Sequence, residues 1–569
     1  MMRILLFGLF LMASATSNGQ HLEIPDTNFK NFLIQSGIDQ NDDGEIQLSE
    51  ADEVHQLNFS SIGSGIIRSL EGIRGFQNLE VLKMGKPIFS DFRIIQNSGM
   101  NWGDQEFRRG SISIQLRNLD LSFNTSLREV DCSGLELDSL NLSNCSKLEL
   151  LNCSRNNLQE LKVSTIAPLK RLNCSENNLS ELNLEYCTQL ESLIFSRNNI
   201  KTVSLEGLKS LKRLDCDTNL LTELSIGASV EFLSCAHNDL KVLSIHPSSE
   251  MLELFCNDNE LTYLTLKSSS LVELNCRNNA IADLNLESGP LKKIQAQDNE
   301  IKKFDFTVYP NLVVANFNQN KIEYVDLRKN DKLKEFQLWR NQAKVLHLSQ
   351  HDSLELIQCD ENQLSKLNLS GLPRLERLYC SQNNLNLLDV SSNVLLRHFY
   401  FAKNNVQQID CSMLPNLTLF SCAANPIKQL DVSQNILLEE LGCSSMLLSN
   451  LDISKNLNLE ALACGSNKLT RIDITDHVYM RSLNCSNNQL TELNIGAKNG
   501  LQHLNCSKNK LKFLNVKNCP RLTMATFDQN AQLQQICISD AQLEFVGRDS
   551  TSSFRWRKDG KVPWVTNCD

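Results

Sequence analysis

Apolar and polar positions follow a fixed period along most of the chain. Segments 148–158 and 169–179 both read L-x-x-L-x-C-x-x-N-x-L, so equivalent positions lie 21 residues apart. At 569 residues the chain exceeds the size at which a single hydrophobic core keeps growing. A short repeat of this kind is typical of a solenoid, in which each repeat forms one coil and neighbouring coils bury a continuous core.

One position of the repeat, which we call the ladder position, is apolar in every copy. It runs from 132 to 527, and 14 of its 20 copies are Cys. The other copies are Phe195, Ala296, Phe317, Leu338, Phe401 and Phe527. Ladder cysteines of stacked coils would lie about 5 Å apart with parallel side chains, whereas a disulfide needs facing Cβ atoms about 3.8 Å apart. We therefore expect free, buried thiols that pack as small hydrophobic groups.

Asn stands three residues after the ladder position in 18 of the 20 copies, with Leu135 and Met446 as the exceptions. Buried backbone N–H and C=O groups need hydrogen-bond partners where the chain turns inward. The Asn side chain offers two donors and two acceptor lone pairs. This column of amides is therefore predicted to join each coil to the next.

Each repeat also carries a second apolar pair with a spacing of two, as in Leu182-x-Leu184 and Leu388-x-Val390. This spacing predicts a second short strand or extended segment on each coil. The predicted fold is an α/β-type solenoid, a horseshoe or arc of about 20 coils of 21 residues. It consists mostly of β-strand and turn, its coils stack about 4.8 Å apart, and a helical cap covers its N-terminal end.

The residue between the two apolar positions is Asp in five consecutive copies, namely Asp389, Asp410, Asp431, Asp452 and Asp473. Such a column either accepts hydrogen bonds in Asx-type turns or collects a cation. We favour the turns, because Asn183, Ser225 and Asn494 occupy the same position in other copies.

The 21-residue repeat with Cys in a Leu position resembles the cysteine-ladder internalins, within the wider group of secreted bacterial leucine-rich-repeat proteins. The resemblance covers about residues 116–530 and is far more specific for the fold than for a ligand. It implies a leucine-rich-repeat solenoid that acts as an adhesin or as a binder of host surfaces.

The chain begins with features of an export signal. Residues 1–15 have a short basic start at Arg3, an apolar run and a small-residue end at Ala13-Ser14-Ala15. Cleavage after Gly19 is an alternative. The apolar run is too short to span a bilayer, which needs roughly 20 residues. We expect a protein that is secreted, extracellular or on the cell surface, with the periplasm as an alternative and without a membrane span.

Residues 20–56 are predicted to form an EF-hand-like helical cap. After a short amphipathic segment around Phe29 and Phe32, residues 39–50 match D-x-[DN]-x-[DN]-G-x5-E at every specified position. Calcium would bind the side chains of Asp39, Asn41, Asp43 and Glu50 and the Glu45 carbonyl. The alternative is a helix-loop-helix cap that has this shape without an ion, as internalin caps resemble a truncated EF-hand.

The remaining segments depart from the repeat. Residues 57–115 are predicted as irregular first repeats with an insertion at 85–115, which contains Trp102 and Phe107 and is either a binding loop or a packed excursion. Residues 531–569 are predicted as a C-terminal cap. Cys537 and Cys568 lie off the ladder there, and we predict that they form a disulfide.

Charge and motifs exclude several functions. The chain has 56 Lys and Arg against 66 Asp and Glu, a net charge of −10, which argues against nucleic acid as a partner. No hydrolase, phosphate-loop or dinucleotide motif is found. His347 and His351 lack the third ligand that zinc needs, so we interpret them as solvated turn residues. We therefore expect no enzyme, and no cofactor other than calcium.

Large side chains gather at the strand positions of a few middle repeats, where residues beside the ladder position face outward on the concave sheet. Aromatic and Arg side chains together are typical of interface hot spots and of sugar-stacking platforms. The predicted ligand-binding residues are Trp339, Arg340, Arg377, Tyr379, His398 and Tyr400. The expected function is recognition of a protein or glycan on a cell or matrix surface, and the alternative is a structural envelope protein that uses the solenoid as a spacer.

Overall fold

The computed structural model describes residues 21–59, 65–85, 113–163, 165–496, 500–548 and 556–568. The predicted export signal at 1–15 and most of the predicted insertion, with Trp102 and Phe107, lie outside these residues. The chain divides into two compact units, Met1–Ser249 and Glu250–Asp569, and we describe each by itself.

Each coil contributes one short strand to a parallel main sheet, and the ladder position follows that strand directly. In the first unit, β9 (Arg171–Asn173) pairs in register with β8 (Leu150–Asn152) and β10 (Ser192–Ile194). The main sheet of this unit also contains β1 (Gln56–Asn58), β3 (Val81–Lys83), β6 (Glu129–Asp131), β11 (Arg213–Asp215) and β13 (Phe232–Ser234).

The second unit continues the same pattern. Its main sheet comprises β15 (Glu253–Phe255), β17 (Glu273–Asn275), β19 (Lys293–Gln295), β20 (Val314–Asn316), β22 (Glu335–Gln337), β24 (Leu356–Gln358), β25 (Arg377–Tyr379), β26 (His398–Tyr400), β27 (Leu419–Ser421), β28 (Glu440–Gly442), β29 (Ala461–Ala463), β31 (Ser482–Asn484), β33 (His503–Asn505), β35 (Met524–Thr526) and β37 (Trp556–Arg557). Parallel pairing in sequence order means that each coil contacts mainly the coils before and after it, as in a repeat solenoid.

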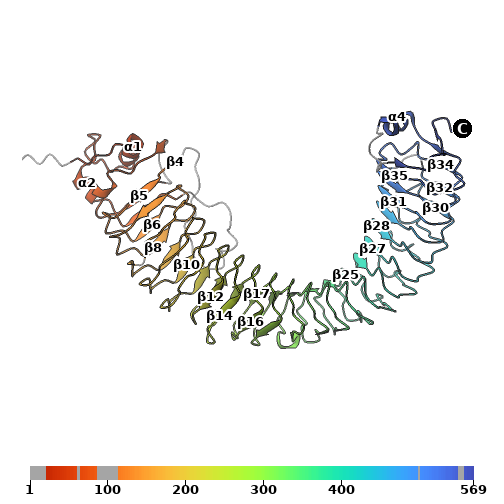
Figure 1. Ribbon diagram of the computed structural model, residues 1–569, viewed down its shortest axis with the longest axis horizontal. Helices are drawn as coiled ribbons and strands as arrows, with labels where there is room; N and C mark the ends of the chain where they lie inside the picture. The colour runs from red at the N-terminus through yellow and green to blue at the C-terminus, as the bar shows by residue number, and fades with distance from the viewer. Residues whose placement is uncertain are drawn as a thin grey trace, which may run out of the picture. The chain divides into compact units, whose positions relative to one another are not determined.

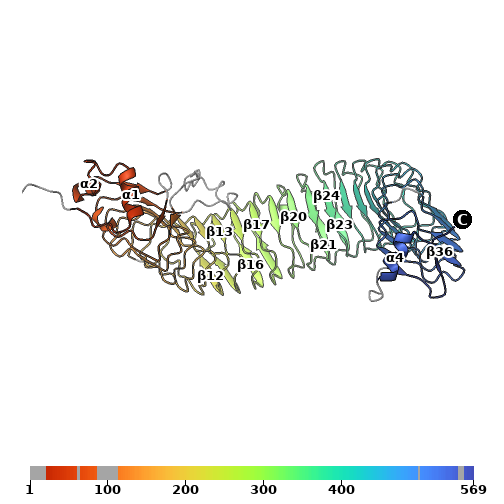
Figure 2. The same ribbon diagram turned by 90° about the horizontal axis from the view of Figure 1, so that it is seen from above.

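Among the described repeats, the second side of the coil forms a strand in some and irregular chain in others. Figure 2 shows main-sheet strands such as β17 and β20 in one row, and second-side strands such as β16 and β21 in another. The second-side pairs of the first unit are β2 (Ile66–Ile67) with β4 (Ser113–Ile114), β5 (Asn118–Asp120) with β7 (Ser139–Asn141), and β12 (Glu223–Ile226) with β14 (Val242–Ile245). Those of the second unit are β16 (Tyr263–Leu266) with β18 (Asp283–Leu286), β21 (Tyr324–Asp326) with β23 (Val345–His347), β30 (Arg471–Asp473) with β32 (Glu492–Asn494), and β34 (Phe513–Asn515) with β36 (Gln535–Cys537) and β38 (Trp564–Val565).

The core lies between the two sides of each coil and is built from columns of one residue type. Leu172 and Cys174 are 1% and 0% exposed, and their equivalents in the neighbouring coils are equally buried. Eighteen cysteines are free and all of them are buried, as the ladder geometry predicts. Burial raises the pKa of the Cys174 thiol to about 12.

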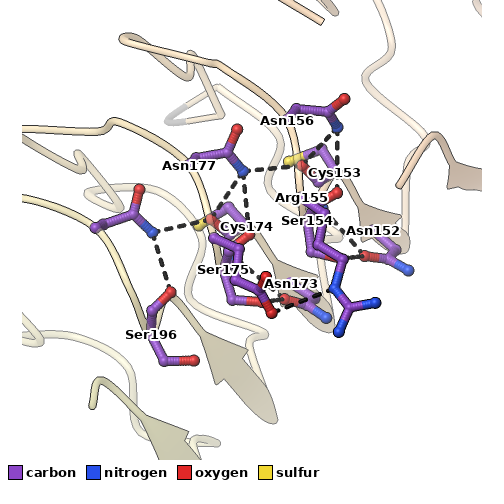
Figure 3. A network of polar contacts seen from close by, with 12 residues as sticks. Asn152, Cys153, Ser154, Arg155, Asn156, Asn173, Cys174, Ser175, Asn177 and Ser196 are labelled. Carbon is purple, nitrogen blue, oxygen red and sulfur yellow. Dashed lines mark hydrogen bonds and ion pairs between the residues drawn. The ribbon is translucent and has the colours of Figure 1, made fainter. Parts of the chain in front are cut away.

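The asparagine column joins neighbouring coils, as expected from its sequence position. Asn177 Nδ2 donates to the carbonyl of Cys153 in the preceding coil (3.0 Å) and to that of Cys174 in its own coil (3.1 Å). Its Oδ1 accepts from the Leu158 N–H at 3.0 Å. Figure 3 shows the bonds of Asn177 Nδ2 to the Cys153 and Cys174 carbonyls, and the bond of Asn156 Nδ2 to the Cys153 carbonyl one coil earlier. One side chain therefore satisfies buried backbone groups of two coils.

A second polar column, which the sequence analysis missed, lies in the turn that follows the second side. Asn393 Nδ2 donates to the carbonyls of Leu369 (3.0 Å) and Leu372 (2.9 Å) in the preceding coil. Cys187 fills the same position, and its thiol lies 3.2 Å from the Val163 carbonyl.

The prediction that His347 and His351 are both solvated turn residues is wrong for His351. His347 is exposed, but His351 is fully buried, and its Nε2 lies 2.9 Å from the Leu327 carbonyl.

The aspartate column forms Asx-type turns. The backbone N–H two residues further on donates to the side chain of each aspartate, at 2.9 to 3.0 Å in all five copies. Side-chain and backbone hydrogen bonds from this same residue lower the pKa of each of the five carboxyl groups.

Helices cover the N-terminal end of the first unit. Helix α1 (Thr27–Gln35) begins after Asp26, which accepts hydrogen bonds from the Asn28 and Phe29 N–H groups. Phe32 stacks on Phe59 with ring centroids 4.2 Å apart. Helix α2 (Leu48–Asp52) follows the loop at 39–47, and the short helix η1 (Ile73–Gly75) lies in the first repeats. Figure 1 shows α1 and α2 at this end.

The C-terminal segment extends the repeat pattern further than the sequence suggested. β37 pairs with β35 of the main sheet, and β36 and β38 continue the second side. Helix α4 (Asp540–Arg548) lies between β36 and β37 in the sequence. A short helix, η2 (Phe306–Val308), lies earlier in this unit. Cys537 and Cys568 form a disulfide with their Cα atoms 5.9 Å apart.

Candidate binding face

Two successive strands of the second unit place a pair of tyrosines side by side. β25 and β26 are in register, with Tyr379 opposite Tyr400 and Arg377 opposite His398. The middle residue of each strand, Leu378 or Phe399, is buried in the core, so its two neighbours lie on the opposite face of the sheet. Tyr379, Tyr400, Arg377 and His398 are all half-buried.

The tyrosine pair is held rigidly. The two rings stack with centroids 5.3 Å apart and an interplanar angle of 26°. The Tyr379 hydroxyl lies 3.0 Å from His398 Nδ1. Burial, followed by the charges of Arg377 and Arg397, lowers the pKa of His398, so the neutral ring can accept a hydrogen bond from the hydroxyl at Nδ1. Burial raises the pKa of Tyr379 and of Tyr400, which keeps both phenols protonated.

Trp339 lies two coils before Tyr379 and has its own set of partners. Its indole Nε1 donates to Glu361 Oε1 at 3.3 Å, and Arg340 Nε donates to Glu361 Oε2 at 3.0 Å. The Arg340 guanidinium lies 5.1 Å from the centre of the Trp339 ring, within the range of a cation–π contact. One carboxylate thus holds both side chains.

Acidic residues that the sequence analysis did not single out complete this face. Arg377 pairs with Glu335 across two coils, with 3.3 Å between Nη2 and Oε1. Asp360 accepts from the Ser381 N–H at 2.9 Å, and burial raises its pKa to about 6. The predicted arginines therefore lie in the expected coils, but both are paired with carboxylates and do not form a free basic patch.

The side chains at the position of Tyr400 become smaller in the coils that follow it. The residues opposite it in the next three strands are Ser421, Gly442 and Ala463. The tyrosine pair therefore stands at the border between large side chains and a strip of small ones. We call the surface formed by Trp339, Arg340, Arg377, Tyr379, His398 and Tyr400 the aromatic face.

The predicted calcium ligands lie in the first unit, in the loop between α1 and α2 and, for Glu50, in α2 itself. Glu50 and Asp39 are buried, whereas Asn41 and Asp43 are exposed. Within the described part of the chain, no three His, Cys, Asp or Glu side chains already converge as a metal-binding group. The described residues also contain no helix that is long and apolar enough to cross a membrane.

Comparisons with known proteins identify the fold. No protein-family model matches the chain. No curated protein matches it either. Among solved structures, YopM from Yersinia enterocolitica WA-314 matches with a TM-score of 0.59 and 20% identity, over 86% of this chain and 92% of that one.

Two further structures illustrate the range of the matches. The Arabidopsis receptor kinase HAESA, in complex with the peptide hormone IDA and the co-receptor SERK1, has a TM-score of 0.54 and 16% identity, covering 87% of this chain and 98% of that one. InlJ from Listeria monocytogenes, described as including a cysteine ladder, is 20% identical over 92% of this chain and 83% of its own. Its TM-score is 0.37, so we draw nothing from that superposition. Together with the repeat and its coils, the better-fitting structures show that the chain is a leucine-rich-repeat solenoid.

Proposed function

We propose that the chain is a non-enzymatic binding protein that recognises a protein partner through the aromatic face. The observation that carries this proposal is the Tyr379–Tyr400 stack, fixed by His398 and half-exposed beside small residues. Rigid aromatic side chains lose little conformational entropy on binding and dominate hot spots. The peptide-bound HAESA complex supports the same use of a leucine-rich-repeat solenoid.

The pairing of the charged groups favours a partner of mixed polarity. Glu335 and Glu361 neutralise Arg377 and Arg340, so the face offers aromatic surface rimmed by satisfied polar groups. This is the composition of a protein interface core and rim. The adhesin-like role, export of the protein and location at a cell surface are part of this proposal. A glycan that stacks on the tyrosines, and a spacer without a ligand, are the alternatives that the experiment separates.

The first step of the test is to find a partner. The purified chain would be screened against a glycan array and a panel of extracellular proteins. A protein hit supports the proposal, a glycan hit with no protein hit supports the sugar alternative, and two empty screens support the spacer.

The second step tests the site with two substitutions. Tyr379→Ala and Trp339→Ala should each weaken binding of the protein hit by roughly thirtyfold, since truncating a hot-spot aromatic commonly costs about 2 kcal/mol. Tyr263→Ala is the matched control, because Tyr263 is 47% exposed on the second side of its coil. If the Trp339/Tyr379 double variant binds like the parent, the aromatic face is not the site, and the segment at 85–115 becomes the candidate.

A further inference from the structure

The loop between α1 and α2 contains a buried carboxylate oxygen without a partner. Asp39 is only 8% exposed, and its Oδ2 accepts from the Gly44 N–H at 2.9 Å. Its Oδ1 is buried and has no hydrogen-bond donor. An unpaired carboxylate oxygen removed from water is costly unless a cation or a donor satisfies it. This oxygen therefore points to a missing ligand.

Other oxygens are arranged around the same loop at alternate residues. Asn41 Oδ1 accepts from the Asp43 N–H at 2.9 Å, and Asp43 Oδ1 accepts from the Glu45 N–H at 2.8 Å. Asp42 and Gly44 have φ values of 58° and 79°, which bend the chain sharply. The side chains of Asp39, Asn41 and Asp43 thus bring oxygens to the loop at alternate residues, and oxygen is the ligand type that calcium prefers.

Glu50 connects the loop to α2. Its Oε1 accepts from the Gln40 N–H at 2.8 Å and its Oε2 from the Gln47 N–H at 2.9 Å. A carboxylate has about four lone-pair sites, so both oxygens retain the capacity to bind an ion. Glu50 therefore lies across the loop at the position where the calcium-binding pattern needs a bidentate carboxylate.

Side-chain amides occupy some of the same oxygens in the structure. Gln47 Nε2 donates to Asp43 Oδ2 at 2.7 Å, and Asn41 Nδ2 donates to it at 3.1 Å. Lys30 pairs with the Glu45 side chain at 2.5 Å. An ion must displace these amide contacts, which favours modest affinity.

We propose that the loop Asp39–Glu50 binds one calcium ion through the side chains of Asp39, Asn41, Asp43 and Glu50 and the Glu45 carbonyl. The ligand set thus consists of three carboxylates, one side-chain amide and one backbone carbonyl. The ion would join the end of α1 to the start of α2. It would thereby hold Phe29 and Phe32 of α1 on Phe59 of the first coil.

Calcium titration of the purified full chain tests the proposal directly. Isothermal titration should give one site with a dissociation constant of about 10⁻⁴ to 10⁻³ M, the range of weak extracellular loops. Hydrogen exchange at residues 27–59 should slow when calcium is added. Asp39→Asn keeps the acceptor for Gly44 but removes the charge, and it should weaken binding at least about tenfold.

The control substitution removes one negative charge from the same loop outside the ligand set. Asp42 is exposed and has a positive φ that Asn tolerates, so Asp42→Asn should leave the affinity within about twofold of wild type. Without calcium, Asp39→Asn should melt no lower than wild type, because it removes the unpaired charge. No heat and no slowing of exchange up to 10 mM calcium, roughly ten times the weak end of that range, would overturn the proposal. Equal losses for Asp39→Asn and Asp42→Asn would overturn it as well, since general attraction to the loop would then explain the binding.

Discussion

Asn177 illustrates how single residues hold the coils together. Its amide contacts three backbone groups that are buried, namely the carbonyls of Cys153 and Cys174 and the N–H of Leu158. The Cys153 and Cys174 carbonyls also accept from Asn156 Nδ2 and Asn198 Nδ2, so loss of the Asn177 amide leaves the buried Leu158 N–H without its partner. The cost of the loss is therefore set by the unsatisfied backbone and not by the weak net value of each hydrogen bond.

We predict that Asn177→Ala lowers the free energy of unfolding by about 1–3 kcal/mol, since one buried unsatisfied group costs about that much. Asn178→Ala is the matched control. Asn178 is exposed, so its loss should change the free energy by less than about 0.5 kcal/mol. Urea unfolding followed by circular dichroism measures both variants. Equal effects of the two substitutions would refute the role of the amide column.

The sequence predicts these amides but not the backbone shape that they stabilise. The residue two positions after the ladder position has a positive φ in every copy, from Gly134 to Gln529. It is Arg155, Glu176 or Thr218 in different coils, and none of these types favours the left-handed region. The repeat pattern of the sequence reveals a position that always has the same residue type. It cannot reveal a position that shares only a backbone angle, and this angle is positive even at Gly134 and Ser445, which are followed by Leu135 and Met446.

At the scale of the strand, columns of equivalent residues form the core. Leu and Cys columns were predictable because each coil places the same residue at the same depth. The Arg340–Glu361 pair was also within reach of the sequence, since its partners lie 21 positions apart and hence in neighbouring coils. The Arg377–Glu335 pair was not, because it reaches across two coils and depends on side-chain length.

The cysteine column makes a prediction about reactivity. Burial raises the pKa of Cys174 to about 12 and that of Cys153 well above its ordinary value, so at pH 8 only about 10⁻⁴ of the Cys174 side chains are thiolate. We predict that a thiol reagent labels almost no cysteine in the native protein and 18 after denaturation without reductant. Addition of a reductant should then release Cys537 and Cys568. Far fewer than 18 thiols in the denatured, unreduced protein would mean that ladder cysteines are cross-linked.

At the scale of the whole molecule, the repeat explains why most of the fold could be predicted and why its ends could not. Each coil packs against the coils beside it and shares their sequence pattern, so the structure of one repeat predicts the structure of its neighbours. The first and last coils each lack one neighbour, and their covers do not follow the repeat. Phe59 is covered by α1, and Phe527 contacts Trp556 and Trp564, with ring centroids 5.6 and 6.1 Å away. The sequence predicted a cap at each end, but it did not predict that β37 and β38 extend both sides of the coil.

Because each coil depends mainly on its neighbours, the destabilisation caused by a core substitution should remain in the coils near it. Leu172 is 1% exposed at the centre of β9, and Leu172→Ala should cost about 2–5 kcal/mol through the cavity it leaves. We predict that amide hydrogen exchange accelerates most in β8, β9 and β10 and progressively less toward β3 and β1, because stability in a solenoid is shared between nearest neighbours.

Leu220→Ala is the control for this last prediction. Leu220 is 40% exposed in the same unit, so the same chemical change there opens no cavity and should leave exchange rates close to those of the parent. Exchange measured by mass spectrometry on peptides from each coil would resolve the gradient. A uniform acceleration from β1 to β13 would show that the first unit unfolds as one cooperative block. That result would contradict the prediction, because the destabilisation caused by the cavity at Leu172 would then reach every repeat of the unit equally.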